Sequence, residues 1–250
     1  MKYLLLLLYL LFSLNLSSAQ FESIRSEEEA KEKIFWLNDY FRESFDEKIY
    51  FNSIYFIVTR ELQKERNKSQ YSYPHCLERM IVEFANMYLD ALSENSHHQS
   101  PLPWQDLFNF EGKPTTHLLL GMNAHISYDL PISLYRISKR MKGCSSDRIK
   151  NDYFELNHFF TNLIPHLNRE LKETHYFMNQ TKSLDFGFEE AIMIKLIKIM
   201  RNEAWKSYLK LLSTKNSSEF EISRKNLEKK AHEKAVFIMS LNFFAPQAGY

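Results

Sequence analysis

Two imidazoles, a carboxamide and a carboxylate lie within one otherwise apolar stretch, residues 117–131 (HLLLGMNAHISYDLP). His125 and Asp129 are four residues apart, so a continuous helix would place both side chains on one face. Imidazole and carboxylate at this spacing can bind one divalent metal ion such as zinc. They can also form an acid–base pair, because a histidine held by a carboxylate titrates near neutral pH. We therefore expect residues 117–131 to contain any functional site.

A second pair with the same spacing, His166 and Glu170, lies further along the chain. Two helices that each contribute such a pair are typical of metal sites inside helical bundles. His117 precedes His125 by about two turns on nearly the same face, and Gly121 between them leaves room for another group. The candidate metal ligands are therefore His117, His125, Asp129, His166 and Glu170.

Ordinary structural roles remain open for the same residues. Nine histidines are expected to give about one His-x-x-x-Asp/Glu pair by chance. His166 and Glu170 can be an exposed ion pair, and Asp129 can cap a helix that starts at Pro131. Asn123 and His125 can also belong to a buried network that joins helices without catalysis. The partners expected for that network are Asp152, Asn157 and His158.

The rest of the chain must position these groups, and its apolar residues recur at helical spacing. Glycine and proline are few, no linker is evident, and strand-like alternation is scarce. The sequence predicts one all-α domain of about eight or nine helices over residues 20–250. Helical segments are expected at 26–45, 47–66, 74–91, 117–130, 132–141, from 147 with a break at Pro165, 188–212 and 220–241. Residues 95–112 are expected to be a loop docked by aromatic side chains.

Local signals sharpen some of these boundaries. Ser26 with Glu29, and Ser218 with Glu221, form the pattern of a capping box. Pro131 is expected to interrupt or restart the helix that contains His125.

The first nineteen residues form a signal-peptide pattern: Lys2, an apolar run from Leu4 to Leu14, and small residues that end at Ala19. The apolar run is too short for a typical membrane span, although an uncleaved anchor is the alternative. We expect export to a periplasmic or extracellular compartment. Without Lys2 the chain has 31 basic and 31 acidic residues, so its formal charge is near zero and we expect no basic surface for binding nucleic acid. We also expect no transmembrane segment in the mature chain.

Cys76 and Cys144 are the only cysteines in the sequence. In an oxidising compartment they can form one disulfide, and two separate buried thiols are the alternative. Two cysteines do not suffice for a zinc ribbon or a disulfide scaffold.

The stretch from Leu118 to Leu130 (LLLGMNAHISYDL) resembles the signature of an uncharacterised family, domain of unknown function 5995. The resemblance implies a helical protein of similar length with a Gly-Met-Asn-Ala-His-Ile-Asn-x-Asp-Leu core. Ser127 stands where that pattern has asparagine. Residues 151–157 are similar to a second, less specific part of the family pattern. The resemblance implies no established activity.

A more distant similarity is to the zinc-dependent phospholipase C and single-strand nuclease group, whose exported all-α enzymes use His-x-x-x-Asp/Glu pairs. It implies that a bound metal would activate water for attack on a phosphodiester. That group uses a Trp ligand at the mature N-terminus, whereas this chain would begin Gln20-Phe21. His75 or His117 would have to replace other upstream ligands.

Three functional hypotheses follow. The first is a non-catalytic exported protein in which Asn123, His125 and Asp129 form a structural network or a site for a small-molecule or protein partner. The second is a metal-dependent hydrolase of the phosphoester type, with His125 and Asp129 as the first ligands and with His117, His158, His166 and Glu170 as further candidates. The third is a metal-free acid–base site at His125 with Asp129 or Asp152.

Overall fold

The computed structural model describes residues 23–95, 99–173 and 190–244, and every regular element in these ranges is a helix. The predicted signal peptide, residues 1–19, lies outside the described residues. The helices are α2 (Glu27–Glu43), α3 (Ile49–Glu65), α4 (Pro74–Asn95), α5 (Leu102–Phe108), α6 (Pro114–Met122), η1 (Asn123–Asp129), α7 (Leu130–Arg140), α8 (Ser146–Glu173), α9 (Glu190–Leu212) and α10 (Ser217–Phe244). The predicted all-α, single-domain bundle is confirmed.

Helix α2 shows how the sequence pattern becomes packing. Ser26 Oγ accepts a hydrogen bond from the Glu29 backbone N–H at 3.1 Å, as its capping pattern predicts. Ile34 and Leu37, three residues apart, are fully buried on one face of the helix. Phe45, the last residue of the expected helical segment 26–45, lies beyond the end of α2 with a positive φ of 54° and is 81 % exposed. The apolar periodicity therefore continues one turn further than the helix does.

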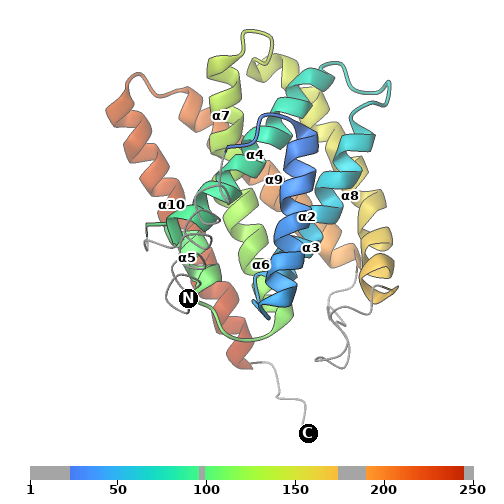
Figure 1. Ribbon diagram of the computed structural model, residues 1–250. Helices are drawn as coiled ribbons and strands as arrows, with labels where there is room; N and C mark the ends of the chain where they lie inside the picture. Colours follow the sequence, from blue (N-terminus) through green and yellow to red (C-terminus); the bar gives the residue numbers. More distant parts are fainter. Residues whose placement is uncertain (1–22, 96–98, 174–189, 245–250) are drawn as a thin grey trace, which may run out of the picture.

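Segments α6, η1 and α7 form one continuous helical rod through the middle of the bundle, with α10 on one side and α2 and α3 on the other (Figure 1). Pro131 lies in the first turn of α7, as the predicted restart of the helix requires, but the helical rod continues across it without a break. The turn before it is a π-helix, in which the Leu130 N–H bonds to the His125 carbonyl five residues earlier. Pro131 has no N–H group to donate a hydrogen bond to the preceding turn of the helix. The wider π-helical turn accommodates the missing hydrogen bond.

Two further boundaries differ from the predictions. Helix α8 continues through Pro165 instead of dividing there. Leu163, Ile164 and Leu167 are buried around this proline, so packing holds the helix across the lost hydrogen bond. Helix α10 is capped by Asn216, whose Oδ1 accepts from the Glu219 N–H at 2.9 Å, and the predicted capping pair Ser218 and Glu221 lies inside the helix.

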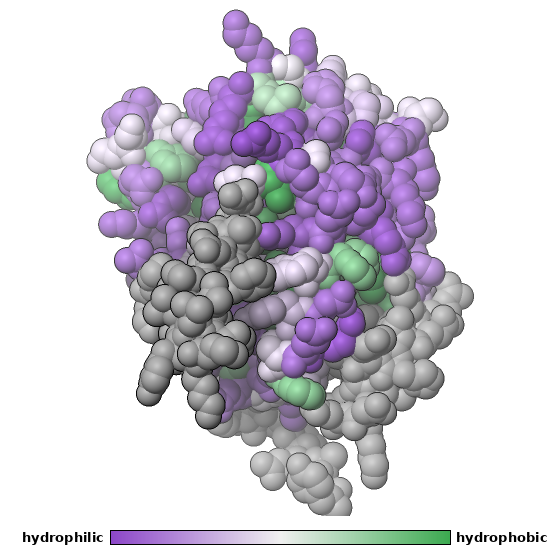
Figure 2. Space-filling model, in the orientation of Figure 1, coloured by the Kyte–Doolittle hydropathy of each residue, from purple (hydrophilic) through white to green (hydrophobic). Residues whose placement is uncertain are grey.

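Cys76 at the start of α4 forms a disulfide with Cys144 in the α7–α8 turn, with a Cα–Cα distance of 5.7 Å. This is the first of the two alternatives that the sequence left open. The predicted loop at 95–112 contains the short helix α5, which buries Trp104 completely. No helix among the described residues combines the length and apolarity needed to span a bilayer. Within the part of the surface that is coloured in Figure 2, polar side chains predominate and the apolar patches are small and separate.

Candidate functional site

The centre of the rod carries a buried His–Asp pair. His125 Nδ1 lies 3.0 Å from Asp129 Oδ2, and both residues belong to the π-helix η1. The indole N–H of Trp104, from α5, donates to the same carboxylate at 3.1 Å and 3.3 Å. His125 is 3 % exposed and Asp129 is not exposed at all. Asp129 therefore orients His125 and does not cap α7, since its side chain makes no capping hydrogen bond.

Aromatic rings fix the plane of the imidazole. Phe84 stacks on His125 with ring centroids 3.3 Å apart and an interplanar angle of 11°. Tyr55 meets the imidazole edge-on at 4.5 Å. With one nitrogen held by Asp129 and one face held by Phe84, the ring leaves a single polar atom, Nε2, for another group. Nε2 is buried and has no hydrogen-bond partner.

Burial dominates the electrostatics of the pair. It lowers the pKa of His125 well below its usual value of 6.5 and raises the pKa of Asp129 well above 3.8, although the hydrogen bond from Trp104 opposes the second change. His125 is therefore uncharged at pH 7. An ionised Asp129 accepts the Nδ1 hydrogen and leaves Nε2 as an acceptor, whereas a protonated Asp129 leaves Nε2–H as a donor. In both arrangements Nε2 offers one hydrogen-bonding position.

His125 lies in the wall of a cavity of about 120 Å³ between α3, α4, α8, α9 and the central rod. The lining is apolar except for four residues: Tyr55, Thr59, His125 and Arg201. The apolar part includes Phe84, Ile164 and Ile197 from three different helices. A mostly apolar cavity with a few polar groups is the usual form of a small-molecule site in a helical bundle.

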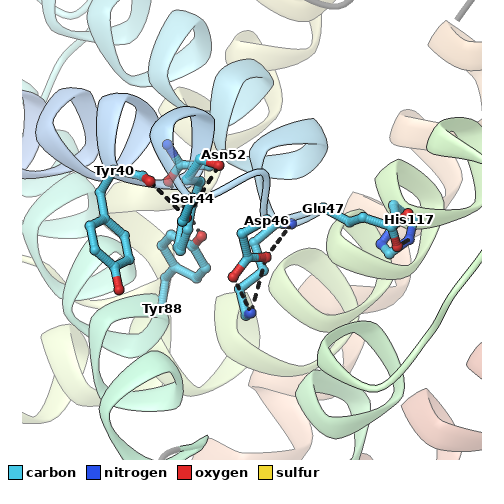
Figure 3. Close-up of polar contacts among 9 residues, drawn as sticks. Tyr40, Ser44, Asp46, Glu47, Asn52, Tyr88 and His117 are labelled. Carbon is cyan, nitrogen blue, oxygen red and sulfur yellow. Dashed lines mark hydrogen bonds and ion pairs between the residues drawn. The ribbon is translucent and has the colours of Figure 1, made fainter. Parts of the chain in front are cut away.

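His117 takes no part in this cavity. It lies in α6 and is buried, and its Nε2 is 2.7 Å from Glu47 Oε2, which the α2–α3 turn brings toward it (Figure 3). Asp46 in the same turn binds the backbone and side-chain nitrogens of Lys48. Burial lowers the pKa of His117 despite the attraction of Glu47. His117 and His125 therefore lie in the same helical rod but have different partners: His117 contacts Glu47, and His125 contacts Asp129.

The predicted partners of the buried network have other roles. Asn123 Nδ2 donates to the Ala231 carbonyl of α10 at 2.7 Å. Asp152 accepts the backbone N–H groups of Ser72 and Tyr73, at 2.9 Å and 2.6 Å. The Oδ1 atom of Asn157 accepts from Arg201, and His158 is exposed. Neither Asn123 nor His125 therefore has a described hydrogen bond to Asp152, Asn157 or His158, the partners predicted from the sequence.

The structure brings together two of the expected metal ligands, His125 and Asp129, whereas His117 pairs with Glu47. His166 is exposed on α8, and the side chain of Glu170 lies outside the described residues. Among the described side chains, the group with potential metal-ligand spacing is His75, Cys76 and Cys144, whose ligand atoms lie within 4.8 Å of one another. Both sulfurs of this group are in the disulfide, whereas zinc binds thiolates. His125 does not belong to this group, so the described side chains offer no set of three ligands for a zinc ion at His125 Nε2.

Two important residues were not assigned to the site from sequence. Trp104 was expected only to dock a loop, and a hydrogen bond to Asp129 across 25 positions has no local signal. Arg201 did have a signal. It lies four residues after Ile197 and four before Trp205, so helical spacing places it on the buried face of α9.

Gly121 does not leave space for a ligand, because Phe51 occupies that space. A Cβ atom at Gly121 would lie 2.5 Å from Phe51 Cγ and 2.8 Å from Phe51 Cβ. We expect Gly121→Ala to lower the free energy of unfolding by about 1–3 kcal/mol, the usual cost of overpacking. Gly143→Ala is the matched control, since its Cβ would meet only the end of the His75 side chain, at 3.2 Å. Equal urea midpoints for the two variants would contradict this account.

These features define a class: an all-α, single-domain bundle with a buried His–Asp pair in the wall of an apolar cavity. The chain belongs to the Family of unknown function (DUF5995), whose family model matches residues 31–241. This match confirms the family that residues 118–130 indicated. No curated protein and no solved structure matched the chain. The comparisons give no support to the similarity with zinc-dependent phospholipases.

Proposed function

We propose that this protein binds a small, largely apolar molecule in the cavity beside His125. The observation that carries the proposal is the Nε2 atom of His125, which is buried and unpartnered and belongs to a mostly apolar lining. A buried polar atom without a partner typically costs about 1–3 kcal/mol. A ligand that hydrogen-bonds to Nε2 would remove that cost, and the apolar wall would bind the rest of it.

The size of the cavity limits the ligand. Its volume is about 120 Å³. A dry, apolar engineered cavity of about 150 Å³ binds benzene, so the volume here suits a molecule of roughly that size or a short alkyl chain. The rigid packing of His125 between Asp129 and Phe84 supports a preformed site, because its ring needs no rearrangement to bind.

Hexan-1-ol is a suitable probe, since it combines a short alkyl chain with one hydroxyl group. We expect saturable binding to the wild-type protein by isothermal titration calorimetry. Ile197→Phe fills part of the cavity wall and should weaken binding at least tenfold. Ile199→Phe adds the same ring on α9 at a position that is 45 % exposed, and it should bind as the wild type does. Circular dichroism establishes that both variants are folded.

Two results would refute the proposal. One is the absence of saturable binding to the wild-type protein. The other is equal binding by Ile197→Phe and Ile199→Phe, which would place the alcohol elsewhere. The milder variant Val58→Ile, which adds one methyl group to the cavity wall, replaces Ile197→Phe if the phenylalanine prevents folding.

We also infer that the protein acts after export. The signal-peptide pattern of residues 1–19 supports this, and so does the disulfide, a bond that is rare in the cytosol. A mature protein that begins at Gln20, determined by mass spectrometry of the exported fraction, is the expected result. Recovery of the intact chain from the cytosol alone would contradict it.

A further inference from the structure

Arg201 is a buried cation in the wall of the same cavity. It lies in α9 and is 3 % exposed. Its Nε donates to Asn157 Oδ1 at 2.9 Å, and its Nη2 donates to the Tyr153 carbonyl oxygen. Both acceptors are neutral and both come from α8. Arg201 therefore links α8 to α9, but these hydrogen bonds do not neutralise its charge.

The remaining contacts of the guanidinium are also uncharged. Its central carbon lies 4.2 Å from the ring centroid of Tyr153 and 5.0 Å from that of Phe160. No carboxylate among the described residues forms an ion pair with Arg201. Burial lowers its pKa, yet an arginine keeps its proton inside proteins. A buried charge without a counter-charge is strongly unfavourable, so an anion is the complementary ligand group.

The described hydrogen bonds use two of the five N–H groups of Arg201. A guanidinium fork can bind a carboxylate through two parallel hydrogen bonds. One positive charge matches one carboxylate. The apolar lining beside Arg201 matches a hydrocarbon group, and Phe160 belongs both to this lining and to the surroundings of the guanidinium.

We propose that the ligand is a small apolar monocarboxylate whose carboxylate binds Arg201 and whose hydrocarbon part fills the cavity next to His125. This inference rests on the proposed function and narrows it from apolar molecules in general to carboxylates. A solely structural Arg201 would join α8 to α9 without preferring any charged ligand.

Hexanoate and hexan-1-ol separate the two proposals, because they have the same number of carbons and differ in charge at pH 7. We expect the wild-type protein to bind hexanoate at least tenfold more tightly than hexan-1-ol in calorimetric titrations. Arg201→Met keeps an apolar side chain in the wall and should abolish this preference while hexan-1-ol still binds. Arg224→Met is the control, since Arg224 pairs with Glu221 and Glu228 outside the cavity and its loss should leave the preference unchanged.

Each other outcome has a definite meaning. Equal wild-type affinities for hexanoate and hexan-1-ol would overturn the carboxylate inference and leave the proposed function standing. Failure of both probes to bind would overturn both. A preference that persists in Arg201→Met would assign the carboxylate to another cation. If Arg201→Met does not fold, Arg201→Lys keeps the charge but loses the fork, and it should retain only part of the preference.

Discussion

Asp129→Ala is expected to lower the free energy of unfolding by about 3–5 kcal/mol, because it removes two buried hydrogen bonds and leaves a void in the core. Asp129 is completely buried and accepts hydrogen bonds from both His125 and Trp104. Its removal leaves His125 Nδ1 and the Trp104 N–H buried without a partner, and each such polar group costs about 1–3 kcal/mol. The shortened side chain also leaves a small void in the core. Urea unfolding at pH 7, followed by circular dichroism, measures this loss.

Two comparison variants separate hydrogen bonding from volume. Asp129→Asn keeps the size and one acceptor oxygen, so it should lose roughly 1–2 kcal/mol, in the range for a single perturbed hydrogen bond. Ser133→Ala removes a polar atom one turn later on the rod, where the hydroxyl is buried without a partner. That change should be close to neutral. A loss for Asp129→Ala as small as that for Ser133→Ala would show that the His–Asp–Trp contacts do not hold the rod in place.

Reduction of the disulfide is expected to have the second large effect. Cys76 and Cys144 are 68 positions apart, and the bond ties the start of α4 to the α7–α8 turn. A loop of this length corresponds to roughly 4 kcal/mol of stabilisation in the chain-entropy model. Urea unfolding with and without dithiothreitol should therefore give clearly different midpoints, with the reduced protein less stable.

The double variant Cys76→Ala/Cys144→Ala supplies the control for reduction. Its midpoint should not respond to dithiothreitol, and its stability should lie near or below that of the reduced wild type, because both positions are buried. Indistinguishable midpoints for oxidised and reduced wild-type protein would contradict the entropic role of the bond. A stable reduced protein would also weaken the argument that the disulfide supports a function outside the cytosol.

The helices were largely predictable because their signals are local. The Ser26 cap and the buried face of α2 follow from residues three or four positions apart, a distance set by the helix itself. The continuity of the helices across the two prolines was not predicted, for the opposite reason. Pro131 and Pro165 both lie within continuous helices, where a π-turn or surrounding packing compensates for the missing N–H group.

The candidate site was only half predictable. The pairing of His125 with Asp129 follows from their spacing, and the structure contains that contact. Their common partner Trp104 comes from another helix, and no sequence pattern of this chain connects the two. The sequence predicted that Gly121 leaves room for another group because it lacks a side chain. Phe51, and not a ligand, occupies that room.

The sequence by itself determined the helical class, the family and the residues of the central rod. Helical periodicity and a short motif both depend only on residues that are close together in the chain. Only the tertiary structure decided what those residues do. It directed Asp129 to His125 and Trp104 instead of to a helix cap, gave Asp152 and Asn157 other partners, and placed Arg201 and His125 around one cavity. Contacts between helices depend on long-range packing and on the cost of burying polar groups, and local spacing encodes neither.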